Sequence, residues 1–368
     1  MVLAKQIIES MEQWAPPHYA ESWDNVGLMV GSKQRNVSKI VTTLDITPEV
    51  IEYAIAEQAQ MIISHHPFIF KGLKSLNLDS SQGKLIEKLI KNDIVVYSAH
   101  TNLDITTGGL NDMLANRLGL TNIRGFVPTG SDAVYKITTF VPTDAADAVR
   151  EAMASAGAGR IGNYEACSFS FVGEGRFRGN DKSRPVIGEA GSLTIVPEVA
   201  VNVIVDSGHK QAVINAMKEA HPYEEVAYEV FTLHEPNVGR TLGRIGELPE
   251  TMNFESFREH LQESLPHANL RFGGIKKDSI KTIALCSGGG AEFIKNAVKA
   301  DAYVTGDVKY HDAQLAKELG LLVVDAGHFG TEEIVADGIR DYLRDQSDKG
   351  GWEIAVQSFE NQADFFFE

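Results

Sequence analysis

A strand–helix alternation that occurs twice is the feature that most constrains the fold. Between residues 39 and 104, the strand-like segments KIVTTL, MIIS and DIVVYSAH alternate with the helical segments TPEVIEYAIAEQ and GKLIEKLIKN. Near the C-terminus, KTIALC, AYVTGD and LLVVDAGH alternate in the same way with AEFIKNAVKA and HDAQLAKELG. This alternation is typical of parallel sheets whose crossover connections are helices.

The two stretches also share a spacing. Asp45 and His66 are twenty-one residues apart, and so are Cys286 and Asp307. The first stretch carries an additional loop, PFIFKGLKSLNLDSSQG, that the second lacks. We interpret this pattern as an internal duplication of an α/β unit.

A different pattern separates the two copies. Residues 128–236 show the order strand–helix–strand–strand–helix–strand, which is the ferredoxin-like order. The polar linkers VPTGSD and HEPNVG mark its ends. We therefore predict an α/β protein with a duplicated outer unit, formed by residues 1–127 and 237–368, and an inserted ferredoxin-like (α+β) domain over residues 128–236.

Composition excludes several classes of function. The formal net charge is −16, so the chain lacks the basic surface with which proteins neutralise nucleic-acid phosphates, and no nucleic-acid partner is expected. No run of eighteen apolar residues occurs, which argues against a membrane span, and the N-terminus lacks a signal-peptide core. The two cysteines show no zinc or disulfide spacing. We expect a cytoplasmic protein.

Histidines stand directly after several of the apolar strands. These are His65, His66, His100 and His328. Ligands of open parallel sheets bind at the carboxyl ends of the strands. Asp104 adds a carboxylate four residues after His100, and either Glu332 or Glu333 adds one in a first helical turn after His328. Imidazoles with carboxylates suit zinc, iron, manganese or nickel, and we expect zinc first.

The number of these groups predicts more than one metal ion. Three imidazoles and two carboxylates exceed the needs of one structural zinc, whereas two ions bridged by water would use all five; this set is His65, His66, Asp104, His328 and Glu332. Water activated by the ions is the expected attacking group, since the chain has no serine or cysteine nucleophile motif. His311, near the end of a strand in the second copy, is the expected proton donor. The glycine run at Gly288 lacks the lysine of a P-loop and predicts a tight turn.

Short motifs add a resemblance to a known family. SWDNVGLMVG, TTLDIT, ISHHPFIF, SAHTNLD, LGRIGELP, TGDVKYHDA and DAGHFGTEE occur in the order found in the NIF-three family, whose members are often labelled homologues of a type-two GTP cyclohydrolase I. The resemblance implies two divalent ions. It places their ligands on His65, His66, Asp104, His328 and Glu332, and so selects Glu332 over Glu333. It leaves Asp45, His100 and His311 around the site.

The resemblance also bears on assembly and activity. The family's inserted domain is similar to the PII and CutA trimers and matches HPYEEVAYEV here, and its members resemble toroids of six subunits, which implies a homohexamer. The label implies opening of the guanine ring of GTP, although no residue set here indicates guanine recognition. Two hypotheses stay open: a metal-dependent hydrolase of a nucleotide or another phosphorylated small molecule, or a non-catalytic metal-binding or regulatory scaffold.

Overall fold

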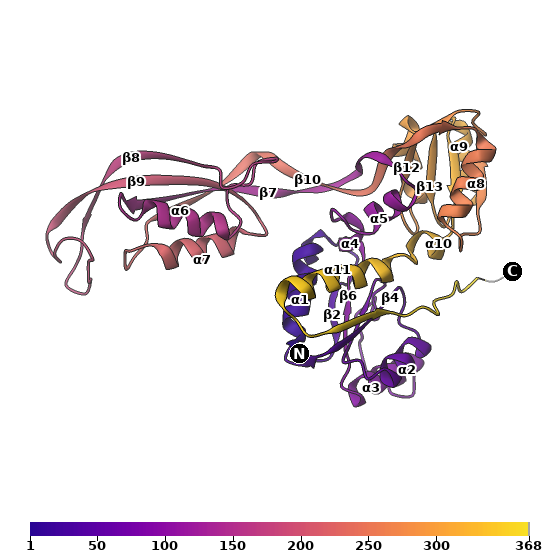
Figure 1. Ribbon diagram of the computed structural model, residues 1–368, viewed down its shortest axis with the longest axis horizontal. Coiled ribbons are helices and arrows are strands. Elements are labelled where there is room, and N and C mark those ends of the chain that lie inside the picture. Colours follow the sequence, from indigo (N-terminus) through magenta and orange to yellow (C-terminus); the bar gives the residue numbers. More distant parts are fainter. Residues whose placement is uncertain (367–368) are drawn as a thin grey trace. The chain divides into compact units, whose positions relative to one another are not determined.

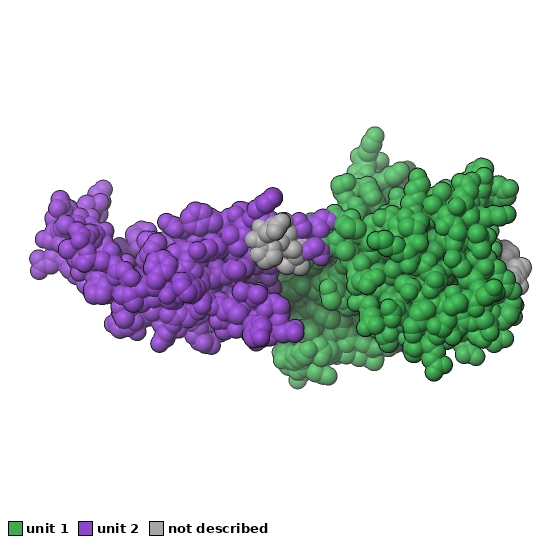
Figure 2. Space-filling model, turned by 90° about the horizontal axis from the view of Figure 1, so that it is seen from above, with its two compact units in different colours: residues 1–129, 240–368 green, residues 130–239 purple. Residues whose placement is uncertain are grey.

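The computed structural model describes residues 1–366, of which residues 235–238 are described for their backbone alone. The chain forms two compact units (Figure 2). Unit 1 comprises Met1–Thr129 and Arg240–Glu368, and unit 2 comprises Gly130–Gly239. Two long strands, β7 (Thr121–Pro142) and β10 (Tyr228–Met252), lead from one unit into the other. Unit 2 therefore interrupts unit 1 in the sequence.

A five-stranded sheet forms the first part of unit 1 (Figure 1). Its order is β15 (Ala355–Ser358), β4 (Lys39–Thr43), β5 (Met61–Ser64), β6 (Val95–Ser98) and β2 (Gly27–Val30). The first four strands are parallel and β2 is antiparallel to β6. β1 (Val2–Leu3) and β3 (Asn36–Val37) pair with each other and form a separate two-stranded sheet.

Helices cover both faces of this sheet, which explains why its central strands are continuous apolar runs. Ile63 and its face neighbours pack against α1 (Ala4–Trp14) and α11 (Val335–Gly350). Ile62 and its face neighbours pack against α2 (Pro48–Ala56) and α3 (Ser81–Lys91). The Thr47 hydroxyl caps α2, because it accepts a hydrogen bond from the backbone N–H of Val50 at the start of the helix.

The second part of unit 1 is also built on a mixed sheet. Its strands follow the order β11 (Arg271–Gly274), β14 (Leu322–Asp325), β13 (Ala302–Thr305), β12 (Ile280–Leu285) and β10. β12, β13 and β14 are parallel, and the two flanking strands are antiparallel to them. Its helices are α8 (Phe254–Ser264), α9 (Tyr310–Glu318) and the 3₁₀ helix η2 (Ala291–Lys299).

Short helices connect the two parts of unit 1. They are η1 (Pro17–Tyr19), α4 (Thr101–Ile105), α5 (Leu110–Arg117) and α10 (His328–Glu332). Buried Arg244 of β10 joins the parts, because its guanidinium pairs with Asp112 and donates to the carbonyl oxygen of Thr106 at 3.0 Å. The C-terminal segment also crosses back, since β15 and α11 pack on β4. The predicted second half, residues 237–368, thus supplies two elements to the first sheet.

Unit 2 has the element order β7, α6 (Ala146–Ser155), β8 (Ser168–Arg178), β9 (Leu193–Asp206), α7 (Lys210–Ala220) and β10. β9 is antiparallel to both β7 and β8. Val201 and Val203 of β9 pack against the helices. Phe169 and Phe171 of β8 lie on the opposite face of the sheet and are largely exposed. Two aromatic side chains on the face opposite the helices are therefore exposed.

The chain thus has a mixed α/β fold with parallel and antiparallel strands, which confirms the predicted class at this level. Within residues 1–366, no helix has both the length and the apolar composition needed to cross a membrane.

Candidate metal centre

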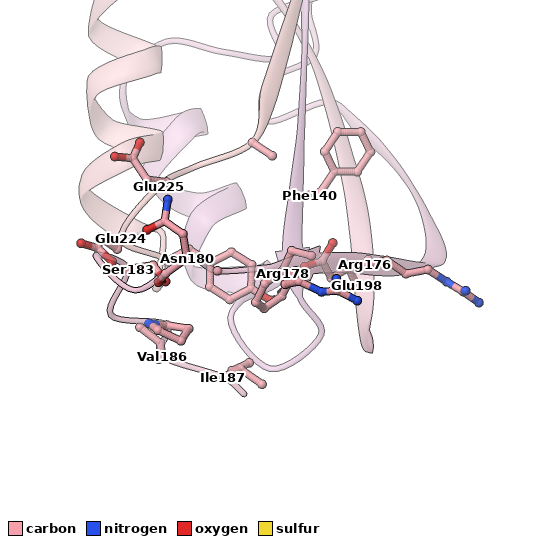
Figure 3. A pocket seen from close by; sticks show the side chains of 16 residues that line it. Phe140, Arg176, Arg178, Asn180, Ser183, Val186, Ile187, Glu198, Glu224 and Glu225 are labelled. Atoms are coloured by element: carbon pink, nitrogen blue, oxygen red, sulfur yellow. Dashed lines mark hydrogen bonds between the residues drawn. The ribbon is translucent and has the colours of Figure 1, made fainter. Parts of the chain in front are cut away.

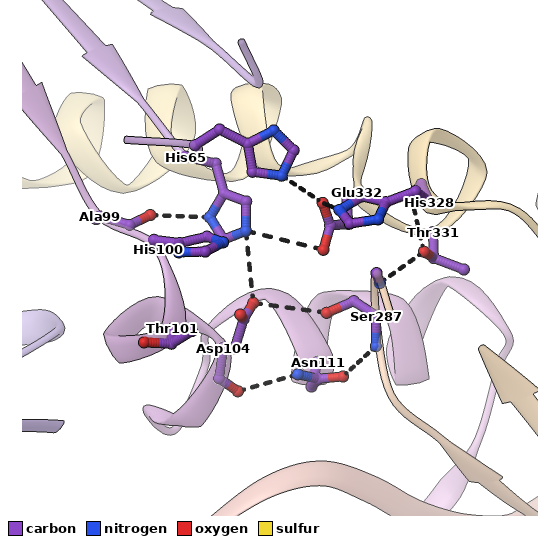
Figure 4. Close-up of polar contacts among 12 residues, drawn as sticks. His65, Ala99, His100, Thr101, Asp104, Asn111, Ser287, His328, Thr331 and Glu332 are labelled. Atoms are coloured by element: carbon purple, nitrogen blue, oxygen red, sulfur yellow. Dashed lines mark hydrogen bonds and ion pairs between the residues drawn. The ribbon is translucent and has the colours of Figure 1, made fainter. Parts of the chain in front are cut away.

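The carboxyl ends of the two parallel sheets of unit 1 deliver the polar residues of one cluster (Figure 4). β5 ends at Ser64 and leads directly to His65 and His66. β6 leads through His100 into α4, which carries Asp104. α10 follows β14 and carries His328 and Glu332. Ligand sites of parallel sheets lie at such strand ends, and here both sheets contribute to a single site.

The imidazole rings lie against one another. Ring centroids are 5.3 Å apart for His65 and His66, 5.1 Å for His65 and His100, and 5.3 Å for His66 and His328. Glu332 joins them, because one carboxylate oxygen lies 2.9 Å from Nε2 of His66 and 3.1 Å from Nε2 of His328. These contacts bring residues from both sheets to one point.

Carboxylates behind the rings fix the orientation of two histidines. Nδ1 of His66 lies 2.8 Å from Asp45, and Nδ1 of His328 lies 2.8 Å from Asp307. In both pairs the aspartate precedes the histidine by twenty-one residues. The structural counterpart of Asp45 and His66 in the second part is therefore Asp307 and His328, and not Cys286 and Asp307 as the sequence spacing suggested. Because Nδ1 is engaged, each ring directs Nε2 toward the centre of the cluster.

The other two histidines are oriented by different groups. Nδ1 of His65 donates to the carbonyl oxygen of Ala99 at 2.8 Å. Nδ1 of His100 lies 2.8 Å from Asp24, which also accepts a hydrogen bond from the backbone N–H of Thr101. Asp24 was not predicted as a site residue, and its place in the segment SWDNVGLMVG is the one feature of the sequence that could have indicated it.

His65 is fully buried, and its Nε2 is an unsatisfied polar atom. Among the described residues this nitrogen has no hydrogen-bond partner, although Asp104 lies 3.6 Å away and Glu332 4.0 Å away. Since Nδ1 carries the hydrogen that is donated to Ala99, the neutral ring presents a lone pair at Nε2. A buried lone pair that faces two carboxylates is the arrangement that a cation would satisfy.

The pKa values reflect this crowding. Burial lowers the pKa of His65 to about 3, so its ring is neutral. Burial also acts on His66, but hydrogen bonds to two carboxylates outweigh it and raise its pKa to about 10. The hydrogen bond to Glu332 raises the pKa of His328 to about 9. Burial, followed by the charge of Glu332, raises the pKa of Asp104 to about 7.

The glycine run after β12 lies against the cluster and forms the predicted tight turn. Gly288 has φ +59°, and its N–H donates to the Thr331 hydroxyl at 2.9 Å. A Cβ at this position would lie 2.3 Å from Oε1 of Glu332 and 3.2 Å from Nε2 of His328. Because Gly288 has no side chain, the Glu332 carboxylate and the His328 ring can occupy this space.

Two groups of side chains here could hold a metal ion: His65, His66 and His100, and His66, His328 and Glu332. Asp104 lies beside the first group at 3.6 Å from His65. His311 is exposed at the start of α9, and among the described residues its ring contacts Gln314 and Tyr310 rather than the cluster. The structure thus brings the five predicted ligands together and leaves His311 apart.

Comparisons with known proteins agree with the motifs. A family model described as Duf34/NIF3 (NGG1p interacting factor 3) matches residues 2–364. The chain is 40% identical over 341 residues to a Halalkalibacterium halodurans protein named GTP cyclohydrolase 1 type 2 homolog, covering 92% of this chain and 91% of the relative. A Bacillus subtilis protein of the same name is 40% identical over 340 residues, with the same two shares covered.

A solved structure gives the same result. The crystal structure of a Bacillus cereus protein related to NIF3 superposes with a TM-score of 0.91 at 40% identity, covering 100% of this chain and 99% of that chain. The match extends over both units and includes the segments that carry the His/Glu cluster. The chain therefore belongs to the Duf34/NIF3 family.

Proposed function

We propose that this protein is a metal-dependent hydrolase with a dinuclear centre that acts on a nucleotide or another phosphorylated small molecule. The observation that carries the proposal is the buried, unpartnered Nε2 of His65, which faces the carboxylates of Asp104 and Glu332. Leaving a buried polar atom without a partner costs about 1–3 kcal/mol, and a bound cation removes that cost.

The proposed ligands come from both sheets of unit 1. They are His65, His66, Asp104, His328 and Glu332. Five nitrogen and oxygen ligands without a thiolate suit two borderline ions, with zinc first and iron, manganese or nickel as alternatives. The shortest separations between the ligand atoms, 2.9 Å and 3.1 Å around Glu332, suit atoms that share one ion.

Bound divalent ions would supply Lewis acidity and lower the pKa of water. The chain's own residues prepare the site for them. Asp45 and Asp307 hold their histidines so that Nε2 faces inward, and Gly288 leaves space beside Glu332. Carboxylates that accept from ligand histidines raise the basicity of those ligands and fix their tautomers.

An aromatic rim supports a nucleotide as the substrate class. Trp23 is 58% exposed, and its ring centroid lies 6.1 Å from that of His100 and 6.0 Å from that of Phe70. Exposed aromatic rings beside a polar site can stack on a planar base. The relatives' name mentions GTP, and ring opening of GTP is one reaction within the proposed class.

The proton-donor role of His311 stays a prediction. Its exposed ring contacts Gln314 at 3.2 Å rather than the cluster, which gives the role no support. The variant His311→Asn tests it through the pH dependence of turnover. An unchanged profile would remove His311 from the mechanism.

Metal analysis of the purified protein tests the proposal, followed by a nucleotide-hydrolysis panel with and without chelator. We expect bound divalent metal and chelator-sensitive turnover, both lost in His328→Ala and retained in His234→Ala, which alters an exposed histidine of unit 2. Absence of metal from the wild-type protein would refute the site. Metal without turnover on any substrate would favour the alternative of a non-catalytic metal-binding or regulatory scaffold.

Three further features belong to the proposal. We propose that residues 128–236 form a ferredoxin-like insertion, which the strand order β10-β7-β9-β8 with two helices supports. We propose a homohexamer, and the exposed Phe169 and Phe171 of β8 support self-association of the chain. The free thiols Cys167 and Cys286 suit the cytoplasm. Light scattering on the eluting protein, compared with 40.2 kDa for one chain, tests the assembly.

A further inference from the structure

Unit 2 contains a cavity of about 380 Å³ that the proposed hydrolase chemistry does not use (Figure 3). It lies between the far end of the β8–β9 hairpin, the loop over residues 179–187, and the segment that connects α7 to β10. Pockets that bind small molecules have volumes of roughly 300–1,000 Å³, so this cavity has room for a small ligand.

Hydrogen bonds hold the wall of this cavity in place. The backbone N–H of Arg184 donates to the carboxylate of Glu224 at 2.9 Å, which ties the loop to the segment after α7. The N–H of Gly191 donates to the carbonyl oxygen of Gly179 at 2.8 Å, which closes the base of the same loop. These two hydrogen bonds therefore connect the segments that bound the cavity.

A buried carboxylate faces the cavity. Glu198 of β9 is 8% exposed, and its Oε1 accepts a hydrogen bond from the Tyr223 hydroxyl at 2.9 Å. Among the described residues, no partner is found for its Oε2. The space for this oxygen comes from Gly175, where a Cβ would lie 2.1 Å from it.

No cation of the chain neutralises Glu198 within the described residues. Arg176 also lines the cavity, but its guanidinium pairs with Glu174. Arg178 is exposed and makes no ion pair with Glu198. Burial and the charge of Glu198 raise the pKa of Tyr223, so this partner is a neutral phenol. Since no cation among the described residues pairs with Glu198, a ligand that brings a positive charge would complement its carboxylate.

Aromatic rings form the apolar part of the wall. Phe140, Phe177 and Tyr223 line the cavity, and the rings of Phe177 and Tyr223 meet edge to face at 5.8 Å. Aromatic faces attract organic cations and cover their apolar parts. The wall thus combines one buried acceptor with several rings.

We propose that this cavity binds a small organic cation, whose ammonium or guanidinium group pairs with Glu198 and whose apolar body packs on the aromatic wall. This site lies in unit 2 and does not depend on the metal centre. Unit 2 would thus bind organic cations as its class of ligand.

Two probes of the same shape test the charge. Butylguanidinium is a cation, and butylurea is its neutral counterpart. Calorimetric titration of the full-length protein should show butylguanidinium binding at least about tenfold more tightly, because only the cation forms a charge-assisted pair. Equal binding of the two probes, or no binding of butylguanidinium at millimolar concentration, would overturn the proposal.

Variants then locate the site. Glu198→Gln keeps the shape and the hydrogen bond of the side chain but removes its charge, so butylguanidinium should bind about ten- to a hundredfold more weakly. Glu225→Gln, which alters an exposed carboxylate at the same cavity, should change binding less than about twofold. Gly175→Ala displaces the Glu198 carboxylate and should also weaken binding. Unchanged butylguanidinium binding in a folded Glu198→Gln protein would refute the assignment of the site to Glu198. If Glu198→Gln does not fold, unchanged binding in folded Gly175→Ala would refute it in the same way.

Discussion

The substitution Gly288→Ala offers a direct test of the metal centre, because it adds one methyl group beside the cluster. The new Cβ would lie 2.3 Å from Oε1 of Glu332, whereas ordinary van der Waals contacts begin at 3.4 Å. The carboxylate would have to retreat by about 1 Å. It cannot do so freely, since it is 3% exposed and its other oxygen contacts His66 and His328.

The expected loss follows from this geometry. Moving a ligand or its support typically lowers metal affinity about 10- to 100-fold, which corresponds to roughly 1.4–2.7 kcal/mol. Independently, alanine at φ +59° destabilises the fold by about 1–2 kcal/mol. Gly320→Ala is the matched control, because Gly320 has φ +71° and a Cβ added there would meet nothing within 4 Å. Only the first substitution should alter metal binding.

Competition with a chromophoric chelator measures metal affinity, and urea unfolding of the metal-free protein measures stability. We expect both alanine variants to lose similar stability, and Gly288→Ala alone to lose metal affinity. Wild-type affinity in Gly288→Ala would refute the reasoning that Glu332 is a ligand in a space shaped by this glycine. An equal loss of affinity in Gly320→Ala would show that the effect is general destabilisation.

Three further substitutions test other parts of unit 1. Asp45→Asn should lower metal affinity about 10- to 100-fold in the same chelator competition, because His66 loses the carboxylate that orients it, and unchanged affinity would contradict this role. Arg244→Met should destabilise the protein by about 3–5 kcal/mol in urea unfolding, since it leaves the carboxylate of Asp112 without its buried partner, and a loss below about 1 kcal/mol would contradict this expectation. Hydrogen bonding to an imidazole and a hydroxyl overcomes burial and lowers the pKa of Asp24 to about 2 from 3.8, so its ionised form stabilises the folded state. Asp24→Asn should therefore cost about 1–2 kcal/mol at pH 7, and the difference from wild type should be present above about pH 4 and disappear as the pH falls through 2. A difference that does not depend on pH would point to packing instead of charge.

The sequence alone determined the class of the fold and the position of the histidines. Continuous apolar runs such as MIIS predict strands buried on both faces, because a parallel sheet covered by helices exposes neither face. His65 and His66 follow such a run directly, so their place at a strand end could be predicted from local pattern. Similarly, a threonine before a helical segment indicates the start of a helix, and the Thr47 hydroxyl caps α2.

Only the tertiary structure decided which residues meet. Asp24 reaches His100 across seventy-six residues, and Glu332 reaches His66 across 266, distances over which no periodic pattern carries information. The repeated twenty-one-residue spacing was visible, but only the structure showed that it pairs Asp307 with His328. His311 illustrates the opposite case, since its position after a strand suggested a role near the cluster, whereas its ring points to solvent. Local pattern determines secondary structure because its forces act between near neighbours, while a site depends on how the sheets pack.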